Sequence, residues 1–197
     1  MQINYKIVDE IFTALDRQIG VLNGTPINLV VCGGTALAAL GLVTRTTRDV
    51  DVLGTVSATE SGLTVHRIKE FPQWLIEAAG KVGRDFDLPK NWLNLGPASQ
   101  VDLGLPEGFE KRLIDRRYGQ YLTIYFISRI DQIHFKLYAA VDRDDYHVQD
   151  LIALMPTEDE MTMAATWVIT QDVSEPFRLI LKDFLEIHGY GAVAQNI

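Results

Sequence analysis

The sequence predicts an α/β (α+β) protein in which a small mixed β-sheet flanked by helices is followed by a helical C-terminal part. Short apolar segments alternate with helix-like segments in the first part of the chain, as in strand–helix–strand units. Later segments carry helical spacing and helix-start signals instead. We therefore expect a core over residues 1–155 and a C-terminal helical extension over residues 156–197 that packs on the same domain.

The N-terminal part of the core indicates two helices and two strands. Apolar residues first recur at helical spacing, and a short apolar run then breaks at Gly33-Gly34 before an Ala- and Leu-rich stretch. A further apolar segment alternates around Asp49 and Asp51. The expected elements are a helix over about 4–19, a strand from 27, a helix over about 35–41 and a strand through 50–52.

The remainder of the chain is dominated by helix signals. Thr157 with Glu160 forms a capping-box pattern, and Ser174 before Pro176 marks a last helix start. The Pro-, Gly- and Asn-rich segment 85–108 indicates mostly loop. The other expected elements are a helix over 60–80, one strand near 101–105, a strand over 121–127 and a helix from 128 to about 141.

Composition indicates a soluble globular protein, since 47% of the 197 residues are hydrophobic and 22% are charged. No apolar run approaches the roughly 18 to 20 residues that span a bilayer, and the polar N-terminus has no signal-peptide profile. We therefore expect a cytoplasmic protein without a membrane partner. The single cysteine, Cys32, lies among apolar residues and is expected to be a buried thiol.

Asp49-Val50-Asp51 is the most informative feature of the chain. Two carboxylates one residue apart in a strand point the same way. Like charges held that close repel each other unless a divalent cation neutralises them, and Mg²⁺ prefers carboxylate oxygens. The pair therefore predicts a metal site for Mg²⁺ or Mn²⁺, the alternative being two surface acids in an exposed strand.

The glycine pair upstream predicts a phosphate site. A Gly-rich strand-to-helix turn exposes backbone N–H groups, which at Gly33, Gly34 and Thr35 would face an anion. A tight turn without a ligand is the alternative. Arg45 and Arg48 precede the acids and are expected either to grip phosphate or to form salt bridges with Asp49 or Asp51.

These motifs resemble the signature of the polymerase-β-type nucleotidyltransferase superfamily. In that superfamily a Gly-Gly or Gly-Ser turn holds a triphosphate, and an Asp-x-Asp strand binds the catalytic metals. Later segments are similar to its branch of DUF6036-like and AbiEii-like proteins, several of which are toxins of toxin–antitoxin pairs. The similar segments are Leu88–Asn94, Ser128–Asp131, Lys136–Ala140, Arg143 and Asp150-Leu151.

The resemblance implies a nucleotidyltransferase-like domain and assigns roles to two later residues. Lys136 would contact the triphosphate, whereas a lysine with its head in solvent is the alternative. Asp150 would orient Lys136 or the nucleotide, or else be an acid at a helix N-terminus. The predicted catalytic residues are Asp49, Asp51, Lys136 and Asp150, with Asp49 and Asp51 holding metal and Gly33, Gly34, Thr35, Arg45 and Arg48 binding the nucleoside triphosphate.

The sequence departs from the superfamily pattern at two places. Many members carry a third metal-binding acid on a later strand, but the segment 121–127 contains none, and Asp102 is the one strand-like substitute. In the related branch an acid often stands three residues before the position of Asp150, where this chain has His147. Both departures count against efficient two-metal catalysis.

Charge and aromatic content bear on the partners. With 18 basic and 26 acidic residues the net charge is −8, which disfavours RNA as acceptor, because RNA affinity comes largely from neutralised phosphates. The dense basic segment Lys111–Arg117 is expected to be a solvated surface rather than an RNA-binding patch. The three tryptophans are expected to be core anchors, with Trp92 as the candidate exception for base stacking because it lies in a loop-like segment. A cognate antitoxin or regulator is a further expected partner.

Two function classes follow. The first is a metal-dependent nucleotidyltransferase that transfers a nucleoside monophosphate to a hydroxyl of RNA, protein or a small molecule. The second is a non-catalytic module of the same fold that binds a nucleotide or a protein. The missing third acid favours the module, and the paired acids favour the enzyme, since an idle site has little physical reason to keep them.

Overall fold

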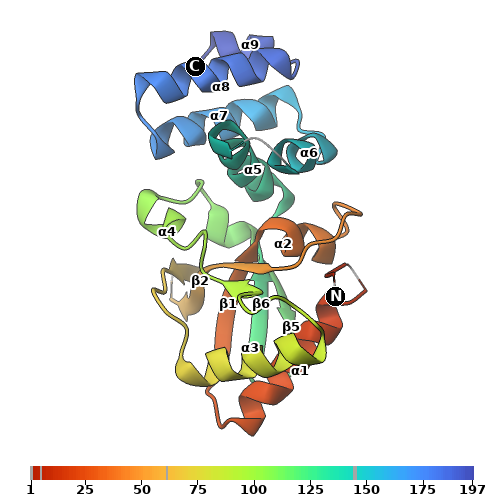
Figure 1. The fold of residues 1–197 in the computed structure, drawn as a ribbon. Coiled ribbons are helices and arrows are strands. Elements are labelled where there is room, and N and C mark those ends of the chain that lie inside the picture. Colours follow the sequence, from red (N-terminus) through yellow and green to blue (C-terminus); the bar gives the residue numbers. More distant parts are fainter. Residues whose placement is uncertain (1, 5, 61, 144–145) are drawn as a thin grey trace. The chain divides into compact units, whose positions relative to one another are not determined.

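The protein forms two compact units, Met1–Ser128 and Arg129–Ile197, which are described separately (Figure 1). The structure, a computed structural model, describes residues 2–4, 6–60, 62–143 and 146–197. The mixed α/β class and the helical C-terminal part are as predicted. The expected domains, 1–155 and 156–197, stay a prediction. Over the described residues, no helix is both long and apolar enough to cross a membrane.

The first unit contains a mixed sheet in the order β3-β2-β1-β6-β5, with β4 paired to β2 off this path. β1 runs parallel to β6, and β4 runs parallel to β2, while the other pairs are antiparallel. This arrangement confirms the predicted small mixed sheet. The strands are β1 (Ile27–Cys32), β2 (Val50–Thr59), β3 (Gly62–His66), β4 (Leu93–Asn94), β5 (Ile114–Arg117) and β6 (Leu122–Phe126).

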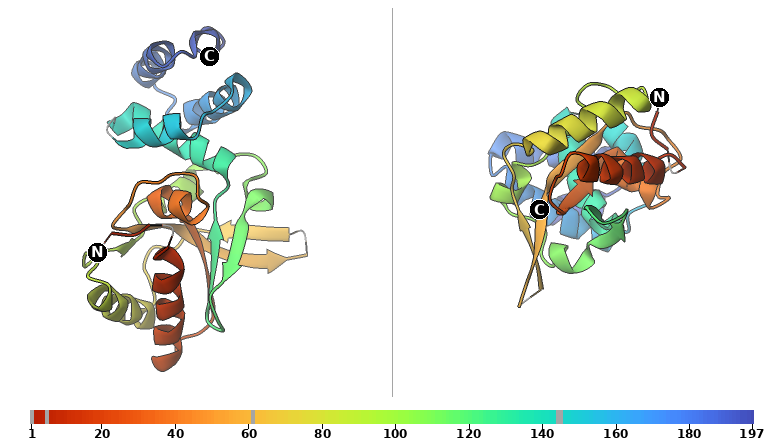
Figure 2. Two further views of the ribbon diagram at one scale, coloured as in Figure 1. Left: turned by 90° about the vertical axis from the view of Figure 1, so that its right-hand side faces the viewer. Right: turned by 90° about the horizontal axis from the view of Figure 1, so that it is seen from below.

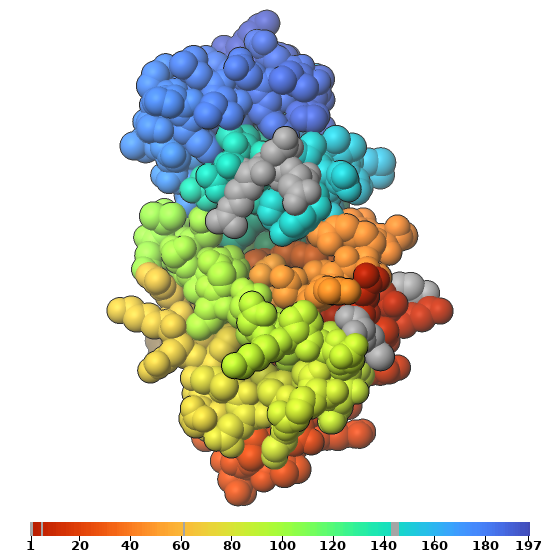
Figure 3. All heavy atoms as spheres, in the orientation of Figure 1, coloured from red at the N-terminus to blue at the C-terminus, as the bar shows by residue number. Residues whose placement is uncertain are grey.

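Two amphipathic helices lie side by side on the sheet and enclose the core of this unit (Figure 2). Apolar side chains of α1 and α3 pack with strand residues such as Leu29, Val52 and Ile124, all of them fully buried. In the space-filling view, α3 and the segment that follows it form much of the visible face of the unit (Figure 3). The helices are α1 (Val8–Val21), α2 (Gly33–Ala39), α3 (Gln73–Asp85), α4 (Gln100–Leu103) and the 3-10 helix η1 (Phe109–Arg112).

The described residues of the second unit form helices joined by short loops, and its predicted helix starts are confirmed. Thr157 and Glu160 form the complete capping box, and the Ser174 side chain accepts from the N–H of Phe177. Hydrogen bonds from Arg129 also lower the pKa of the Glu160 carboxyl group. The helices are α5 (Arg129–Arg143), α6 (Tyr146–Ala153), α7 (Glu158–Gln171), α8 (Glu175–Ile187) and α9 (Gly191–Gln195).

Two predictions between residues 60 and 108 are wrong. The expected helix over 60–80 is a strand, β3, and a helix, α3, that begins only at Gln73 after Pro72. β3 pairs with the far half of β2, and this cross-strand pairing outweighs local propensity. The expected strand near 101–105 is the short helix α4, which ends before Gly104 at φ +99°. Asp102 therefore lies on a helix and not on a strand.

A buried carboxylate fixes the hairpin of β5 and β6 against α1. Asp16 is 7% exposed, and its Oδ1 accepts from the N–H groups of Tyr121 and Leu122 at 2.7 and 2.8 Å. A Cβ atom on Gly119 would overlap this carboxylate, so the turn can approach Asp16 only because residue 119 is glycine. The α1 helix thus positions the turn that leads into the central pair β6 and β1.

We expect Asp16→Ala to lower the free energy of unfolding by about 3 kcal/mol, because the buried N–H of Leu122 and the partly buried N–H of Tyr121 lose a charged acceptor. Glu10→Ala, which removes an exposed acid from the same helix, is the matched control and should change stability by less than about 0.5 kcal/mol. Urea denaturation followed by circular dichroism measures both. Equal stability of the two variants would contradict the assigned role of Asp16.

Candidate functional site

The glycine turn after β1 has the geometry that its sequence predicts. Cys32 is extended, with φ −123° and ψ −166°, and Gly33 follows with φ +67°, a left-handed conformation that side chains disfavour. The helix that begins there, α2, has seven residues, too few for a sizeable helix dipole. An anion at this turn would therefore be held by the backbone N–H groups themselves.

The sheet places Asp51 directly against this turn. In the antiparallel pair of β1 and β2, Cys32 is the partner of Asp51, and the Cys32 thiol lies 3.7 Å from the Asp51 carbonyl oxygen. A Cβ atom on Gly33 would overlap Oδ2 of Asp51. Glycine is thus required at position 33 both for its backbone conformation and for the space that the carboxylate occupies.

Asp49 is tied to the same turn through two threonines. The hydroxyl of Thr35 donates to the Asp49 carbonyl oxygen at 2.6 Å, and the hydroxyl of Thr47 donates to its Oδ1 at 2.7 Å. Thr47 in turn borders Gly34, whose Cβ position would lie 3.0 Å from the Thr47 Cβ. Asp49 itself is exposed and Asp51 is half-buried, so neither acid is fully enclosed by the fold.

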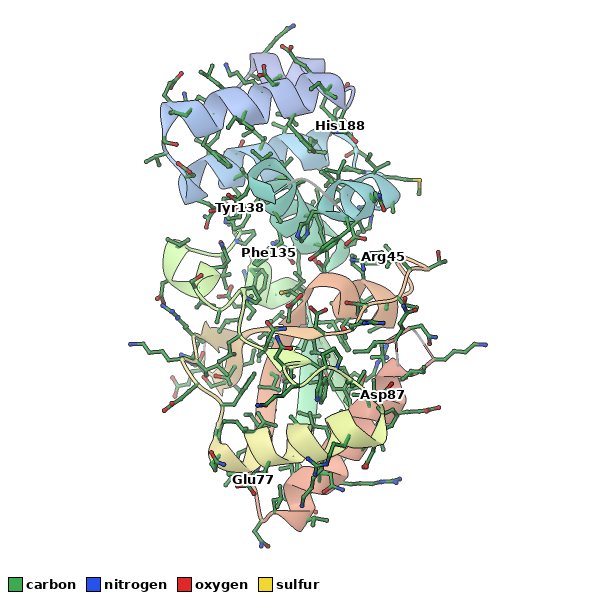
Figure 4. The ribbon with its side chains drawn as sticks, viewed as in Figure 1. Arg45, Glu77, Asp87, Phe135, Tyr138 and His188 are labelled. Carbon is green, nitrogen blue, oxygen red and sulfur yellow. The ribbon has the colours of Figure 1, made fainter. Side chains whose placement is uncertain are left out.

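Arg45 belongs to this group, whereas Arg48 is only exposed next to it. Arg45 lies in the loop after α2, with Nη2 3.2 Å from the Cβ position of Gly34 and Nη1 donating to the Thr46 carbonyl oxygen (Figure 4). The geometry therefore leaves a phosphate-binding role for Arg45 open.

The N-terminal segment supports this loop, which the sequence did not indicate. Ile3 forms a two-hydrogen-bond bridge with Thr47, at 2.7 and 2.9 Å, and its side chain is 1% exposed. The hydroxyl of Thr46 also donates to the side chain of Gln2. The loop that carries Thr47 toward Asp49 is therefore anchored in the core.

Asn94 is a residue of the site to which sequence reasoning assigned no role. It is the parallel partner of Asp51 across β4 and β2, and its Nδ2 donates to Asp51 Oδ1 at 3.1 Å. Its own Oδ1 accepts from the N–H of Gly96 at 2.8 Å. The available signal was an asparagine directly after the apolar pair Trp92-Leu93, in a segment noted only for its family resemblance.

The chemistry of the donor set fits a hard cation held by two carboxylates. Asp49 and Asp51 would supply the carboxylate oxygens for such a cation. Among the described residues, no three His, Cys, Asp or Glu side chains come close enough to hold a metal ion. Asp102 does not supply the third acid, because it is exposed on α4 and paired with Arg67. A bound cation would need its remaining ligands from nucleotide and water.

Lys136 and Asp150 meet within the second unit. The Lys136 ammonium lies 2.8 Å from Asp150 Oδ2, and the two side chains are 5% and 1% exposed. The His147 Nδ1 is 3.5 Å from the same ammonium, and the Tyr146 ring centroid is 5.5 Å away. Lys136 is therefore not a lysine with its head in solvent, and Asp150 lies inside α6 rather than at its N-terminus. The side chain of Arg143 lies outside the described part of the chain.

The predicted site residues thus form two groups. The first unit brings together Gly33, Gly34, Thr35, Arg45, Asp49 and Asp51, joined by Asn94. The second unit brings Lys136 to Asp150. The union of the two groups in one site stays a prediction.

Comparison with known families covers both groups. A family model described as a nucleotidyltransferase of unknown function, DUF6036, matches residues 10–163. The chain belongs to the DUF6036 family. No curated protein and no solved structure matches the chain. The match spans the glycine turn, the paired acids, Asn94, Lys136 and Asp150.

In this DUF6036 protein the arginines of the basic segment are engaged with their own chain. Arg112, Arg116 and Arg117 each donate to a nearby acceptor at 2.7 or 2.8 Å. The acceptors are the carbonyl oxygens of Glu107 and Gly119 and the carboxylate of Asp9. These contacts favour the interpretation of the segment as a structural surface over that of an RNA-binding patch.

Trp92 is a core residue, so its prediction as a base-stacking platform is wrong. Its side chain is 1% exposed, and its Nε1–H donates to the Ala79 carbonyl oxygen at 2.9 Å. The ring packs on Gly83 of α3, where a Cβ atom would come within 3.0 Å of it. The loop-like composition around Trp92 concealed this, because the ring is buried by a helix earlier in the chain.

We expect Lys136→Met to lower the free energy of unfolding by about 3–5 kcal/mol, because the buried Asp150 carboxylate loses the charge that balances it. The double variant Lys136→Met/Asp150→Asn should recover most of this loss, since the amide carries no charge. Urea denaturation measures both, with Lys182→Met on α8 as the control. A double variant less stable than Lys136→Met would show that the charge pair is not the cause.

Proposed function

We propose that this protein is a metal-dependent nucleotidyltransferase that transfers a nucleoside monophosphate from a nucleoside triphosphate to a hydroxyl acceptor. The observation that carries the proposal is the packing of the Asp51 carboxylate against Gly33, with Asp49 tied to the same turn. The carboxylates and the glycine turn then share one small region. Such a region suits a polyphosphate together with its cation.

Asp49 and Asp51 would hold Mg²⁺ or Mn²⁺. When bound, the cation would neutralise charge on the phosphate oxygens that the two acids would otherwise repel. The fixed strand position of Asp51 and the hydroxyl bond from Thr47 to Asp49 support this role, because they set both carboxylates before a ligand arrives. The two carboxylates would thus bind the cation in orientations that the fold has already set.

The phosphate tail would lie on the turn. The N–H groups at Gly33, Gly34 and Thr35 would donate to it, and the Arg45 guanidinium beside Gly34 would add a charged donor. A phosphate contact of Lys136 is implied by the family resemblance alone, and Asp150 would orient its ammonium at 2.8 Å. Arg48 is exposed and is assigned a weaker phosphate contact.

In the transfer itself the hydroxyl oxygen of the acceptor bonds to the α-phosphorus. The bond from that phosphorus to the oxygen bridging toward the β-phosphate breaks, and pyrophosphate leaves. The hydroxyl proton passes to water or to a nearby carboxylate. Positioning and electrostatic stabilisation carry most of the catalysis in such reactions, so two acids can support it at a reduced rate.

The charge of the protein and its family resemblance bear on the acceptor and the biological role. A net charge of −8 and the engaged arginines of β5 and η1 favour a protein or small hydroxyl compound over RNA. The resemblance to AbiEii-like proteins supports a toxin-like role with a cognate antitoxin as partner. A gene for a small regulator next to this one would strengthen that assignment.

A specific observation favours a second function, a non-catalytic nucleotide-binding module. On β4, the residue next to Asp51 is Asn94, an amide and not an acid. Asp102 lies on α4, and among the described residues no third acid joins Asp49 and Asp51. Such a module would bind the triphosphate and leave it intact.

We expect nucleoside triphosphates to bind with Mg²⁺ and to bind at least tenfold more weakly without it, because the two carboxylates then repel the phosphates. Isothermal titration with each of the four triphosphates measures this. Asp49→Asn/Asp51→Asn should abolish the difference between the two conditions. Asp85→Asn/Asp87→Asn, which makes the same charge change at the last residue of α3 and two residues after it, should keep it (Figure 4). No triphosphate binding by the wild type would refute the proposal.

We also expect label from the α-phosphate, and not from the γ-phosphate, to be transferred to an acceptor in pools of cellular RNA, protein or small molecules. The γ label should leave as pyrophosphate. Asp51→Asn should lose transfer while keeping its circular dichroism spectrum. Tight binding by the wild type without transfer to any pool would replace the enzyme with the nucleotide-binding module.

A further inference from the structure

Asn94 has a fixed orientation beside Asp51. Its Oδ1 accepts from the N–H of Gly96 at 2.8 Å, which leaves the amide NH₂ to face Asp51 Oδ1 at 3.1 Å. A backbone N–H can only donate, so this bond settles which end of the amide points to the carboxylate. An NH₂ group donates and cannot ligate a cation. Asn94 therefore acts on the Asp51 carboxylate and not on a metal.

The carboxylate of Asp51 is confined from two sides. Oδ1 receives the amide of Asn94, and Oδ2 occupies the space that a Cβ atom on residue 33 would need. A carboxylate oxygen carries two lone pairs, so the bond from Asn94 does not by itself prevent Oδ1 from binding a cation. The side-chain rotamer of Asp51 is thus set before a ligand binds. Hydrogen-bond partners of metal ligands commonly fix the orientation of those ligands in this way.

The position of Asn94 is also the position that an additional acid would take. It lies opposite Asp51 in the parallel pair of β4 and β2, at hydrogen-bonding distance. A carboxylate there would stand about 3 Å from that of Asp51, and two ionised groups so close repel strongly unless a cation lies between them. The amide replaces this repulsion with an attraction, and it does so without a cation.

We infer that Asn94 is a positioning residue that holds Asp51 ready in the absence of metal, so that the cation enters together with the nucleotide and not before it. The inference rests on the proposed function, since it concerns the same site. Two carboxylates hold a lone Mg²⁺ weakly, and the phosphates supply the missing charge and ligands. An acid at position 94 would reverse this order.

Asn94→Asp tests the inference, with Asn91→Asp as its matched control. Residue 91 is an exposed asparagine three positions earlier, so the control adds the same charge away from Asp51. In EDTA, Asn94→Asp should melt several degrees below the control, and added Mg²⁺ should restore it. Titration with Mg²⁺ alone should show at least tenfold tighter binding to Asn94→Asp than to the wild type.

Asn94→Ala provides the second test. It should bind Mg²⁺ with a triphosphate about tenfold more weakly than the wild type, because Asp51 loses its fixed orientation, while its melting temperature changes little. Equal nucleotide binding by Asn94→Ala and the wild type would overturn the inference. So would a melting response of Asn94→Asp to Mg²⁺ no larger than that of Asn91→Asp.

The two proposals fail differently. If the wild type binds no triphosphate, the proposed function falls, whereas Mg²⁺-dependent stabilisation of Asn94→Asp would still support the placement of residue 94 beside Asp51. If the wild type binds Mg²⁺ alone as tightly as Mg²⁺ with triphosphate, the order of binding inferred from Asn94 is wrong and the nucleotide site stands.

Discussion

The register between β1 and β2 is the constraint on which the candidate site depends. The pairing shifts by one residue between Val30 and Val31, so that Cys32 meets Asp51 instead of Val52. Side chains alternate along a strand, and without this bulge the residue opposite Cys32 would be an apolar one. With this bulge, Val52 packs in the core, and the neighbouring residue Asp51 places its carboxylate against Gly33.

The segments beside the paired ends of β1 and β2 explain why the site can be rigid in a small sheet. β4 adds only two residues to the edge of β2, but one of them is the amide that orients Asp51. On the other side the buried Ile3 anchors the loop before Asp49. Two short segments thus hold Asp49 and Asp51 in place. Such an arrangement suits a site that keeps its geometry while leaving room for a ligand.

Local patterns predicted the parts of the molecule that local interactions build. The glycine turn, the strand that carries Asp51, the capping box at Thr157 and the cap at Ser174 each depend on residues a few positions apart, although Asp49 lies just before that strand and not in it. The errors lie where distant pairing decides. β3 is a strand because β2 is long enough to pair with it, and Asn94 reaches Asp51 across 43 residues of sequence. No periodicity in either segment encodes its partner.

The buried pair of Lys136 and Asp150 has a consequence for how any anion would find this lysine. Opposite unit charges 2.8 Å apart form a dipole, whose field decays with distance much faster than that of a lone ammonium. A polyphosphate in solution would feel almost no pull toward such a lysine until contact. Long-range electrostatic steering, which accelerates the capture of anions by exposed basic surfaces, is therefore weak at Lys136. Lys136 would distinguish between anions only through direct contact.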